Sequence, residues 1–318
     1  MIRSNTSPKR STLAVPGSSI KMLEKAKTIE VDEIFLDLED SVALSEKTLA
    51  REKVVGVLIN GGFKSKTVAV RVNEQITSIG IEDVSSIVLQ AGKYLNSLII
   101  PKVESAEQVR DLSKRLTELE KSGELNPGSI RIQIQIESAL GLSRVGEIAS
   151  SSDRIEALIF GPGDFAASIG MQVIHIGENP INFPGDDAYH YVLMSILIAA
   201  RANNLMAIDG PYSDISNIEG LVNRSRLSAA LGYDGKWVIH PGQIETVNTA
   251  FTPSQAAFDG AARIIEHFAN ESTNTNQKGA LLFEGKMIDE ASRKMAEGLY
   301  AKGIASGLVP STRGDENG

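Results

Sequence analysis

The segment from residue 131 to residue 164, RIQIQIESALGLSRVGEIASSSDRIEALIFGPGD, predicts two adjacent strands of a parallel sheet with an acid after each. Residues 131–136 alternate polar and apolar side chains, as a strand does, and stop at Glu137. Residues 158–160 are a short apolar run that stops at a glycine-bent turn holding Asp164. Because a helix between two strands sets the second beside the first in parallel, we expect both acids at the same edge of the sheet.

Two carboxylates that converge at such an edge suit a hard divalent cation. Mg²⁺ typically takes one or two carboxylates together with water and substrate oxygens. Glu137 and Asp164 are therefore candidate Mg²⁺ ligands. The alternative is that each acid only ends its strand and caps the helix that follows.

The rest of the chain repeats the same strand–helix unit. Short apolar or alternating runs predict eight strands, at residues 12–16, 31–38, 67–72, 98–100, 131–136, 158–160, 205–208 and 237–239. Helical apolar spacing at nearly every crossover predicts an α/β fold, a (β/α)8 TIM barrel with a C-terminal linker and helical tail. An open flavodoxin-like sheet is the alternative, because periodicity alone does not close a barrel.

Polar residues follow most of these strands at their C-terminal ends, which is the rim where barrel enzymes carry their chemistry. They are Glu39, Arg71, Lys102, Glu137, Asp164, Asp209 and His240. For Lys102, two interpretations stay open. It either forms a Schiff base, as in metal-independent aldolases, or pairs with the nearby Glu104.

The domain organisation follows from a polar segment near the C-terminus. We expect residues 1–269 to form the barrel and residues 270–318 to form a linker and a helical tail. In the tail, Asp289 starts the last helix. On physical grounds alone, it is either the cap of that helix or an acid that works in a site.

The composition limits the possible partners and compartments. The chain has 318 residues, of which 42% are hydrophobic and 23% charged, as in an ordinary globular protein. Its formal net charge of -8 argues against nucleic acid or an anionic membrane as the main partner. There is no cysteine and no long apolar run, so we expect neither thiolate metal sites nor a transmembrane helix, and we expect a cytoplasmic location.

The sequence resembles the citrate lyase beta-chain-like carbon–carbon lyases of the HpcH/HpaI aldolase/citrate lyase superfamily, which include malyl-CoA lyase and citramalyl-CoA lyase. The matching segments run in family order from Arg10 to Asp289. They are RSTLAVPG, FLDLEDSV, AREKVV, RVN, PKVES, QIESALGL, FGPGDFAASIG, AIDGPY, GKWVIHPGQI and GKMID. One departure is Ala14, where family members often carry an aromatic residue, and it removes one packing contact expected for coenzyme A.

The resemblance implies roles for individual residues. Glu137 and Asp164 correspond to the Mg²⁺ ligands, and Arg71 corresponds to the residue that holds the oxygens of a keto acid. Asp289 corresponds to an acid–base aspartate that reaches into the site of a neighbouring subunit, which implies that the tail packs on that subunit in a homotrimer or hexamer.

The resemblance also assigns two lysines to the coenzyme A thioester. Lys21 and Lys25 match positions that contact coenzyme A. They are four residues apart, so they share one face of the first helix, near its N-terminus, where anions are favoured. The alternative is a solvated helix face.

The implied activity is a Mg²⁺-dependent lyase, or in reverse a synthase, acting on malyl-, methylmalyl- or citramalyl-CoA. The products would be acetyl- or propionyl-CoA and glyoxylate or pyruvate. Three alternatives stay open: the beta subunit of a citrate lyase, a malyl-CoA thioesterase, and a non-catalytic barrel that binds CoA esters. We expect the segment between Phe165 and Pro184 to shape the acyl or keto-acid pocket.

Overall fold

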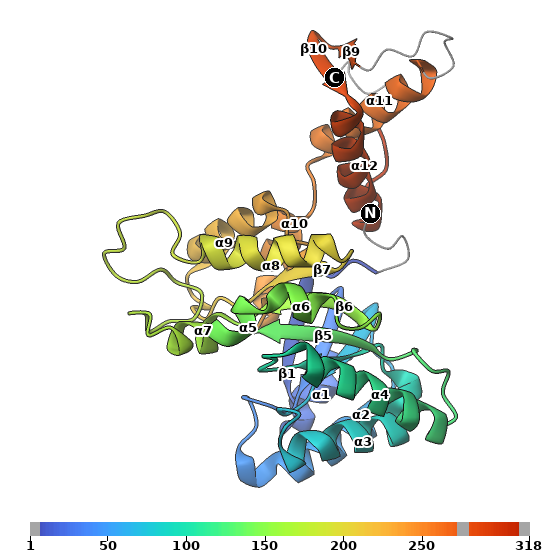
Figure 1. Cartoon of the computed structure of the whole chain (residues 1–318), viewed down its shortest axis with the longest axis vertical. Coiled ribbons are helices and arrows are strands. Elements are labelled where there is room, and N and C mark those ends of the chain that lie inside the picture. Colours follow the sequence, from blue (N-terminus) through green and yellow to red (C-terminus); the bar gives the residue numbers. More distant parts are fainter. Residues whose placement is uncertain (1–6, 272–279, 312–318) are drawn as a thin grey trace. The chain divides into compact units, whose positions relative to one another are not determined.

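The computed structural model describes residues 7–271 and 280–311. The described residues divide into two compact units, one that ends at Phe251 and one that begins at Thr252. The first unit is a closed barrel of eight parallel strands that pair in sequence order, with β1 closing on β8 (Figure 1). The predicted (β/α)8 barrel is therefore confirmed, and the open sheet is excluded.

The eight strands have similar lengths and carry mainly buried side chains. They are β1 (Ser11–Pro16), β2 (Glu33–Asp37), β3 (Thr67–Arg71), β4 (Ser97–Ile100), β5 (Arg131–Ile136), β6 (Ile155–Phe160), β7 (Met206–Asp209) and β8 (Gly235–Val238).

The helices of the first unit follow the strands in the expected alternation. They are α1 (Ile20–Ala26), α2 (Lys47–Asn60), α3 (Ser78–Ala91), α4 (Ala106–Ser122), α5 (Ala139–Ser143), α6 (Val145–Ala149), α7 (Pro162–Ser168), α8 (His190–Ala202), α9 (Ile218–Leu231) and α10 (Ile244–Phe251). Serine, threonine or asparagine side chains cap several of them, and α4 begins with a full capping box between Ser105 and Gln108.

Two apolar cores hold the barrel together. The larger core lies between the strands and the surrounding helices, and the smaller core fills the inside of the barrel. Inside, Trp237 lies against Phe35 with ring centroids 4.4 Å apart. These two rings form a floor beneath the rim, and the guanidinium carbon of Arg71 lies 5.4 Å from the Trp237 ring.

The N-terminal end of the barrel interior is charged and polar. Lys9 is buried and pairs with Glu33 and, at 3.2 Å, with Glu156. Gln133 on β5 donates to Glu33 over 2.9 Å and to Ser97 over 2.8 Å. This network closes the barrel at the end opposite to the rim. In barrel enzymes, that end contributes to stability and does not carry the active site.

The second unit is built on two helices and a hairpin. Helix α11 (Gln255–Glu271) packs against α12 (Glu290–Ala305), where Phe258 and Tyr300 stack with ring centroids 4.9 Å apart. Strands β9 (Ala280–Phe283) and β10 (Lys286–Asp289) form an antiparallel pair just before α12.

The boundary between the units lies after Phe251 and differs from the predicted one at residue 269. Helix α11 falls in the second unit, where it packs on α12. Helical periodicity shows that α11 has an apolar face but does not show which partner covers it. Most of the predicted linker, residues 272–279, lies outside the described residues.

Within the described parts of the chain, no helix is both long and apolar enough to cross a bilayer.

Candidate active site

The centre of the rim is an ion pair between neighbouring strands. Asp37 at the end of β2 and Arg71 at the end of β3 are partners in the parallel register. Arg71 Nε donates to Asp37 Oδ1 over 2.7 Å, and Nη2 donates to Asp37 Oδ2 over 2.8 Å. Burial alone would raise the pKa of Asp37, but the charge and hydrogen bonds of Arg71 outweigh burial and lower it. The guanidinium is thus fixed in one orientation.

Two further acids, from the loop after β2, lie near Nη1, the guanidinium nitrogen of Arg71 that does not bind Asp37. Nη1 lies 2.9 Å from the buried Glu39 Oε2 and 3.2 Å from Asp40 Oδ2. Asp40 is largely exposed, so its bond competes with water. Burial raises the pKa of Glu39 against the opposing charge of Arg71.

Lys102 joins this network from the loop after β4. Its ammonium donates to Glu39 over 2.8 Å, so the predicted pairing with Glu104 is wrong. Glu104 accepts instead from Ser138, over 2.7 Å. Burial would lower the pKa of Lys102, but the hydrogen bond to Glu39 raises it well above its usual range. A Schiff base requires a neutral amine, so this environment opposes that role.

Glu137 lies directly after β5, buried and held from several sides. Its Oε1 accepts from the backbone N–H of Lys102 over 2.7 Å, and its Oε2 accepts from Gln135 Nε2. The backbone of Gly161 packs against it so closely that an added Cβ would lie 2.6 Å from Oε2. Only glycine fits at that position.

The charge around Glu137 favours a cation. Burial, together with the negative charges of Glu39 and Asp164, raises the pKa of Glu137 to about 8 against the hydrogen bond from Lys102. A divalent cation between Glu137 and Asp164 would remove this repulsion, and carboxylate oxygens are the donors that Mg²⁺ prefers. The residues present therefore fit Mg²⁺.

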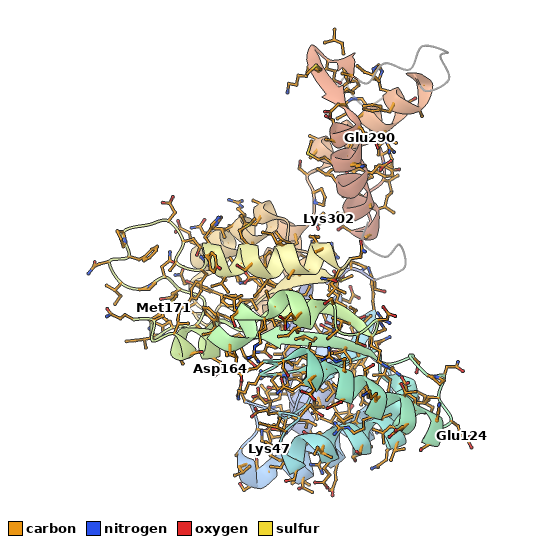
Figure 2. The ribbon with its side chains drawn as sticks, viewed as in Figure 1. Lys47, Glu124, Asp164, Met171, Glu290 and Lys302 are labelled. Carbon is orange, nitrogen blue, oxygen red and sulfur yellow. The ribbon has the colours of Figure 1, made fainter. Side chains whose placement is uncertain are left out.

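Asp164 reaches this place from the first turn of α7. Pro162 and Gly163 start that helix directly after β6, and Asp164 is exposed. Figure 2 labels Asp164 beside the green part of the barrel. Its negative charge raises the pKa of Glu137.

In the described residues, no group of three or more histidine, cysteine, aspartate or glutamate side chains is arranged to hold a metal ion. A Mg²⁺ ion at Glu137 and Asp164 would therefore have to complete its shell with water and substrate oxygens.

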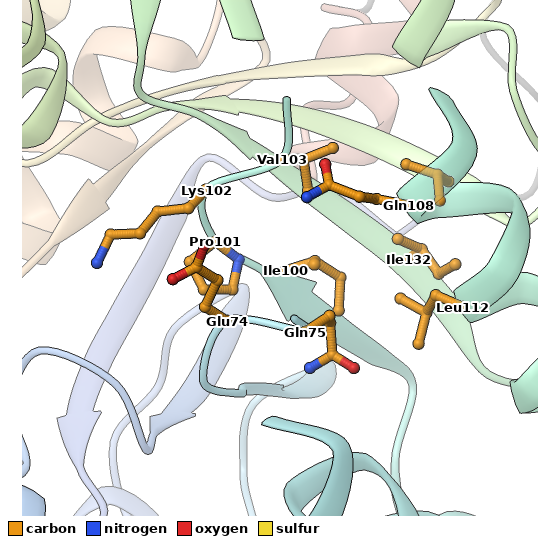
Figure 3. Close-up of a pocket in the computed structure, with 10 residues that line it drawn as sticks. Glu74, Gln75, Ile100, Pro101, Lys102, Val103, Gln108, Leu112 and Ile132 are labelled. Carbon is orange, nitrogen blue, oxygen red and sulfur yellow. The ribbon is translucent and has the colours of Figure 1, made fainter. Parts of the chain in front are cut away.

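A small cavity of about 10 Å³ lies beside the site, between the loops after β3 and β4. Its lining includes Glu74, Gln75, Lys102 and Val103 (Figure 3). In the figure, the Lys102 side chain extends away from the other lining residues. The cavity has room for about one water molecule, so an acyl chain does not fit inside it.

The remaining predicted residues lie on other elements. Lys21 and Lys25 are exposed on α1. Asp289 is exposed in the second unit and caps α12, since its Oδ1 accepts from the Ser292 N–H over 3.0 Å. Hydrogen bonds from Ser292 lower the pKa of Asp289.

Sequence reasoning missed two residues of the site. Asp37 was not among the predicted site residues, because its pairing with Arg71 depends on the register between strands. Gln135 precedes Glu137 by two residues, so strand alternation already put both side chains on one face. That signal could have identified Gln135 as a neighbour of the proposed ligand.

The sequence of residues 10–241 matches the HpcH/HpaI aldolase/citrate lyase family. The chain belongs to this family. The predicted family is thereby confirmed, and the chain is an enzyme of a lyase family whose barrel fold it shares.

Individual relatives cover almost the whole chain. The L-malyl-CoA/beta-methylmalyl-CoA lyase of Cereibacter sphaeroides is 36% identical over 299 residues, which are 91% of this chain and 93% of that protein. The citrate lyase subunit beta of Haemophilus influenzae is 36% identical over 281 residues, 88% of this chain and 92% of that one.

A solved structure extends the similarity to three dimensions. Protein CitE from Mycobacterium tuberculosis, in complex with magnesium, acetoacetate and coenzyme A, superposes with a TM-score of 0.71 at 26% identity. The match covers 95% of this chain and 99% of that chain.

Proposed function

We propose that this enzyme is a Mg²⁺-dependent carbon–carbon lyase that cleaves a 3-hydroxyacyl-CoA such as malyl-, methylmalyl- or citramalyl-CoA. Products are acetyl- or propionyl-CoA and glyoxylate or pyruvate. The observation that carries the proposal is the buried Glu137 carboxylate, whose pKa is raised to about 8 beside Asp164 and near the fixed guanidinium of Arg71. Identity of 36% to a malyl-CoA/methylmalyl-CoA lyase supports the same substrate class.

Glu137 and Asp164 would hold the Mg²⁺ ion. When bound, the ion supplies Lewis-acid polarisation of the substrate oxygens and orients them. Glu137 is suited to this role because its two oxygens are already fixed by Lys102 and Gln135.

Arg71 would bind the carboxylate of the keto-acid part of the substrate. The bonds to Asp37 use Nε–H and one Nη2–H, which leaves the second Nη2–H for a substrate. The exposed Asp40 can leave Nη1 at low cost, because its bond is long and open to water. A planar guanidinium suits two carboxylate oxygens better than an ammonium does.

Asp289 of a neighbouring subunit would act as the acid–base group. In cleavage, the ionised Asp289 accepts the proton of the substrate hydroxyl, which becomes the carbonyl of the keto acid. The electron pair of the broken C–C bond moves to the thioester enolate, which takes a proton from Asp289. In condensation the direction reverses, and the lowered pKa keeps Asp289 ionised and ready to accept a proton.

This assignment requires an oligomer, and we propose a homotrimer or a hexamer of this chain. Lys21 and Lys25 would bind the phosphates of coenzyme A, because they are exposed on one face of α1. A cytoplasmic location is part of the proposal, since a chain without cysteine suits a reducing compartment.

The test is an assay with paired readouts on a panel of malyl-, methylmalyl- and citramalyl-CoA with Mg²⁺. Release of keto acid together with an acyl-CoA supports the lyase. Release of free thiol without cleavage of the carbon chain identifies a thioesterase instead. No turnover of any ester contradicts the proposal, and tight ester binding without product identifies a non-catalytic barrel.

A citrate lyase beta subunit is the second candidate, supported by the 36% identity to the Haemophilus influenzae protein. It would act on a citryl thioester of a carrier protein and release oxaloacetate. Co-purification with an acyl carrier protein, and activity only on that thioester, would favour this function.

A further inference from the structure

We propose that Gln135 and the backbone N–H of Lys102 are positioning groups that fix the Glu137 carboxylate for Mg²⁺. This inference rests on the proposed function, in which Glu137 is a metal ligand. Neither group would touch the metal, and both would act through Glu137.

Gln135 acts from the same strand as Glu137. Residues two apart on a strand point to the same face, so the side chain of Gln135 lies next to that of Glu137 inside the barrel. Gln135 is 4% exposed and Glu137 is 2% exposed. The Gln135 Nε2 donates to Glu137 Oε2, without water between them.

The backbone of Gly161 closes the other side of this pair. A Cβ at Gly161 would lie 2.5 Å from the Glu137 Cβ and 2.9 Å from the Gln135 Nε2. Both side chains therefore pack against the backbone of Gly161, where a residue with a Cβ would not fit. A residue with a Cβ at position 161 would therefore displace the Glu137 and Gln135 side chains or the turn that leads to Asp164.

Lys102 holds the second oxygen through an unusual backbone conformation. Its φ is +53°, in the left-handed region that residues with a Cβ rarely adopt. This conformation aims the N–H at Glu137 Oε1 over 2.7 Å, while the ammonium reaches Glu39 over 2.8 Å. One residue thus connects the proposed ligand to the acids around Arg71.

Each oxygen of the Glu137 carboxylate therefore already accepts one hydrogen bond. A carboxylate offers about four lone-pair sites, so two remain, and their directions are set by the two donors. Groups that orient a metal ligand in this way typically contribute about 10- to 100-fold to metal affinity or activity.

The test is the Mg²⁺ affinity of the full-length Gln135→Met variant, measured by calorimetry. Methionine keeps the length of the side chain and removes the hydrogen-bond donor. The matched control is Gln133→Met, on the same strand and the same face but bound to Glu33 and Ser97 at the other end of the barrel. We expect Mg²⁺ to bind about 10- to 100-fold more weakly to Gln135→Met and within about twofold of the wild type to Gln133→Met.

Kinetics separate positioning from a general structural role. For Gln135→Met, we expect the Mg²⁺ concentration for half-maximal activity to rise while the KM for the CoA ester at saturating Mg²⁺ stays unchanged. Thermal unfolding without Mg²⁺ reports on the fold of each variant. Equal Mg²⁺ affinity in Gln135→Met and the wild type overturns the role of Gln135, as does an equal loss in Gln133→Met.

A second pair of variants tests whether the backbone conformation of Lys102 positions Glu137. These variants leave the side chains of the barrel core unchanged. Lys102→Gly and Lys102→Val both lose the ammonium, but only glycine tolerates the left-handed φ. We expect Lys102→Gly to bind Mg²⁺ at least about 10-fold more tightly than Lys102→Val. Equal affinities contradict the backbone role. If the wild type itself binds no Mg²⁺, the proposed function fails together with this inference.

Discussion

Arg71 and Asp37 are register partners on adjacent strands, and the guanidinium of one binds both carboxylate oxygens of the other, over 2.7 and 2.8 Å. The floor beneath them is aromatic, because Trp237 and Phe35 lie within 6 Å of the guanidinium carbon, at 5.4 and 5.9 Å. Asp37 sets the plane of the guanidinium, so under the proposed function it orients Arg71 for a substrate carboxylate.

Replacement of Arg71 by lysine keeps the charge and removes the planar fork. We expect Arg71→Lys to lower kcat/KM by about 10²-fold or more, because a misplaced binding group of this kind costs about that much. Steady-state kinetics on malyl-CoA measure it. Arg110→Lys, on the exposed face of α4, is the matched control and should stay at the wild-type value.

Replacement of Asp37 by asparagine tests the orientation of Arg71 separately from its charge. We expect Asp37→Asn to raise the KM for glyoxylate in the condensation direction, by about 10-fold, while Mg²⁺ affinity stays near the wild-type value. A change confined to Mg²⁺ binding would place Asp37 in the metal site instead.

Removal of a proposed metal ligand should weaken Mg²⁺ binding. We expect Glu137→Gln and Asp164→Asn each to bind Mg²⁺ more weakly than the wild type by calorimetry, since each leaves a single carboxylate. Glu104→Gln is the control, because Glu104 lies on the neighbouring loop and bonds to Ser138. Wild-type Mg²⁺ affinity in either ligand variant refutes the assignment of that ligand.

The buried pair of Glu120 and Arg154 predicts a pH dependence of stability. Burial alone would raise the pKa of Glu120, but hydrogen bonds from Arg154 and from two backbone N–H groups lower it. A lowered pKa means that this stabilisation is present above the unfolded-state value of about 4.3 and is lost as the pH falls through the folded-state value.

The measurement is the free energy of unfolding of wild type and Glu120→Gln from denaturant titrations. At pH 7 we expect Glu120→Gln to be less stable by about 3–5 kcal/mol, because Arg154 stays buried without its partner. The difference should shrink below about pH 4. A difference that is constant from pH 3 to pH 7 would disprove an ionic origin.

The proposed role of Asp289 in a neighbouring site predicts complementation between inactive subunits. We expect Asp289→Asn to lower kcat by about 10²-fold or more with unchanged Mg²⁺ affinity. Refolded mixtures of Asp289→Asn and Arg71→Ala subunits should regain activity, since some sites then have both residues. The control mixes Arg71→Ala subunits with subunits that carry both substitutions. It should restore no activity, because no subunit then has Arg71.

The sequence predicted the barrel and its rim because strand and helix periods repeat along the chain, and parallel strands end at one edge. It predicted Glu137 and Asp164 at one edge of the sheet for the same reason. It could not predict the Arg71–Asp37 pair, because strand register is a three-dimensional property. It put the boundary between the units after α11 and not before it, because an amphipathic pattern does not name the surface that covers it.

The central claim is that Glu137 and Asp164 hold one Mg²⁺ ion beside Arg71. A crystal structure of the enzyme with Mg²⁺ and glyoxylate tests it most directly. We predict one ion at about 2.0–2.1 Å from an oxygen of Glu137 and of Asp164, with the carboxylate of glyoxylate on Arg71. An ion bound elsewhere in the barrel, or glyoxylate bound away from Arg71, would contradict the account.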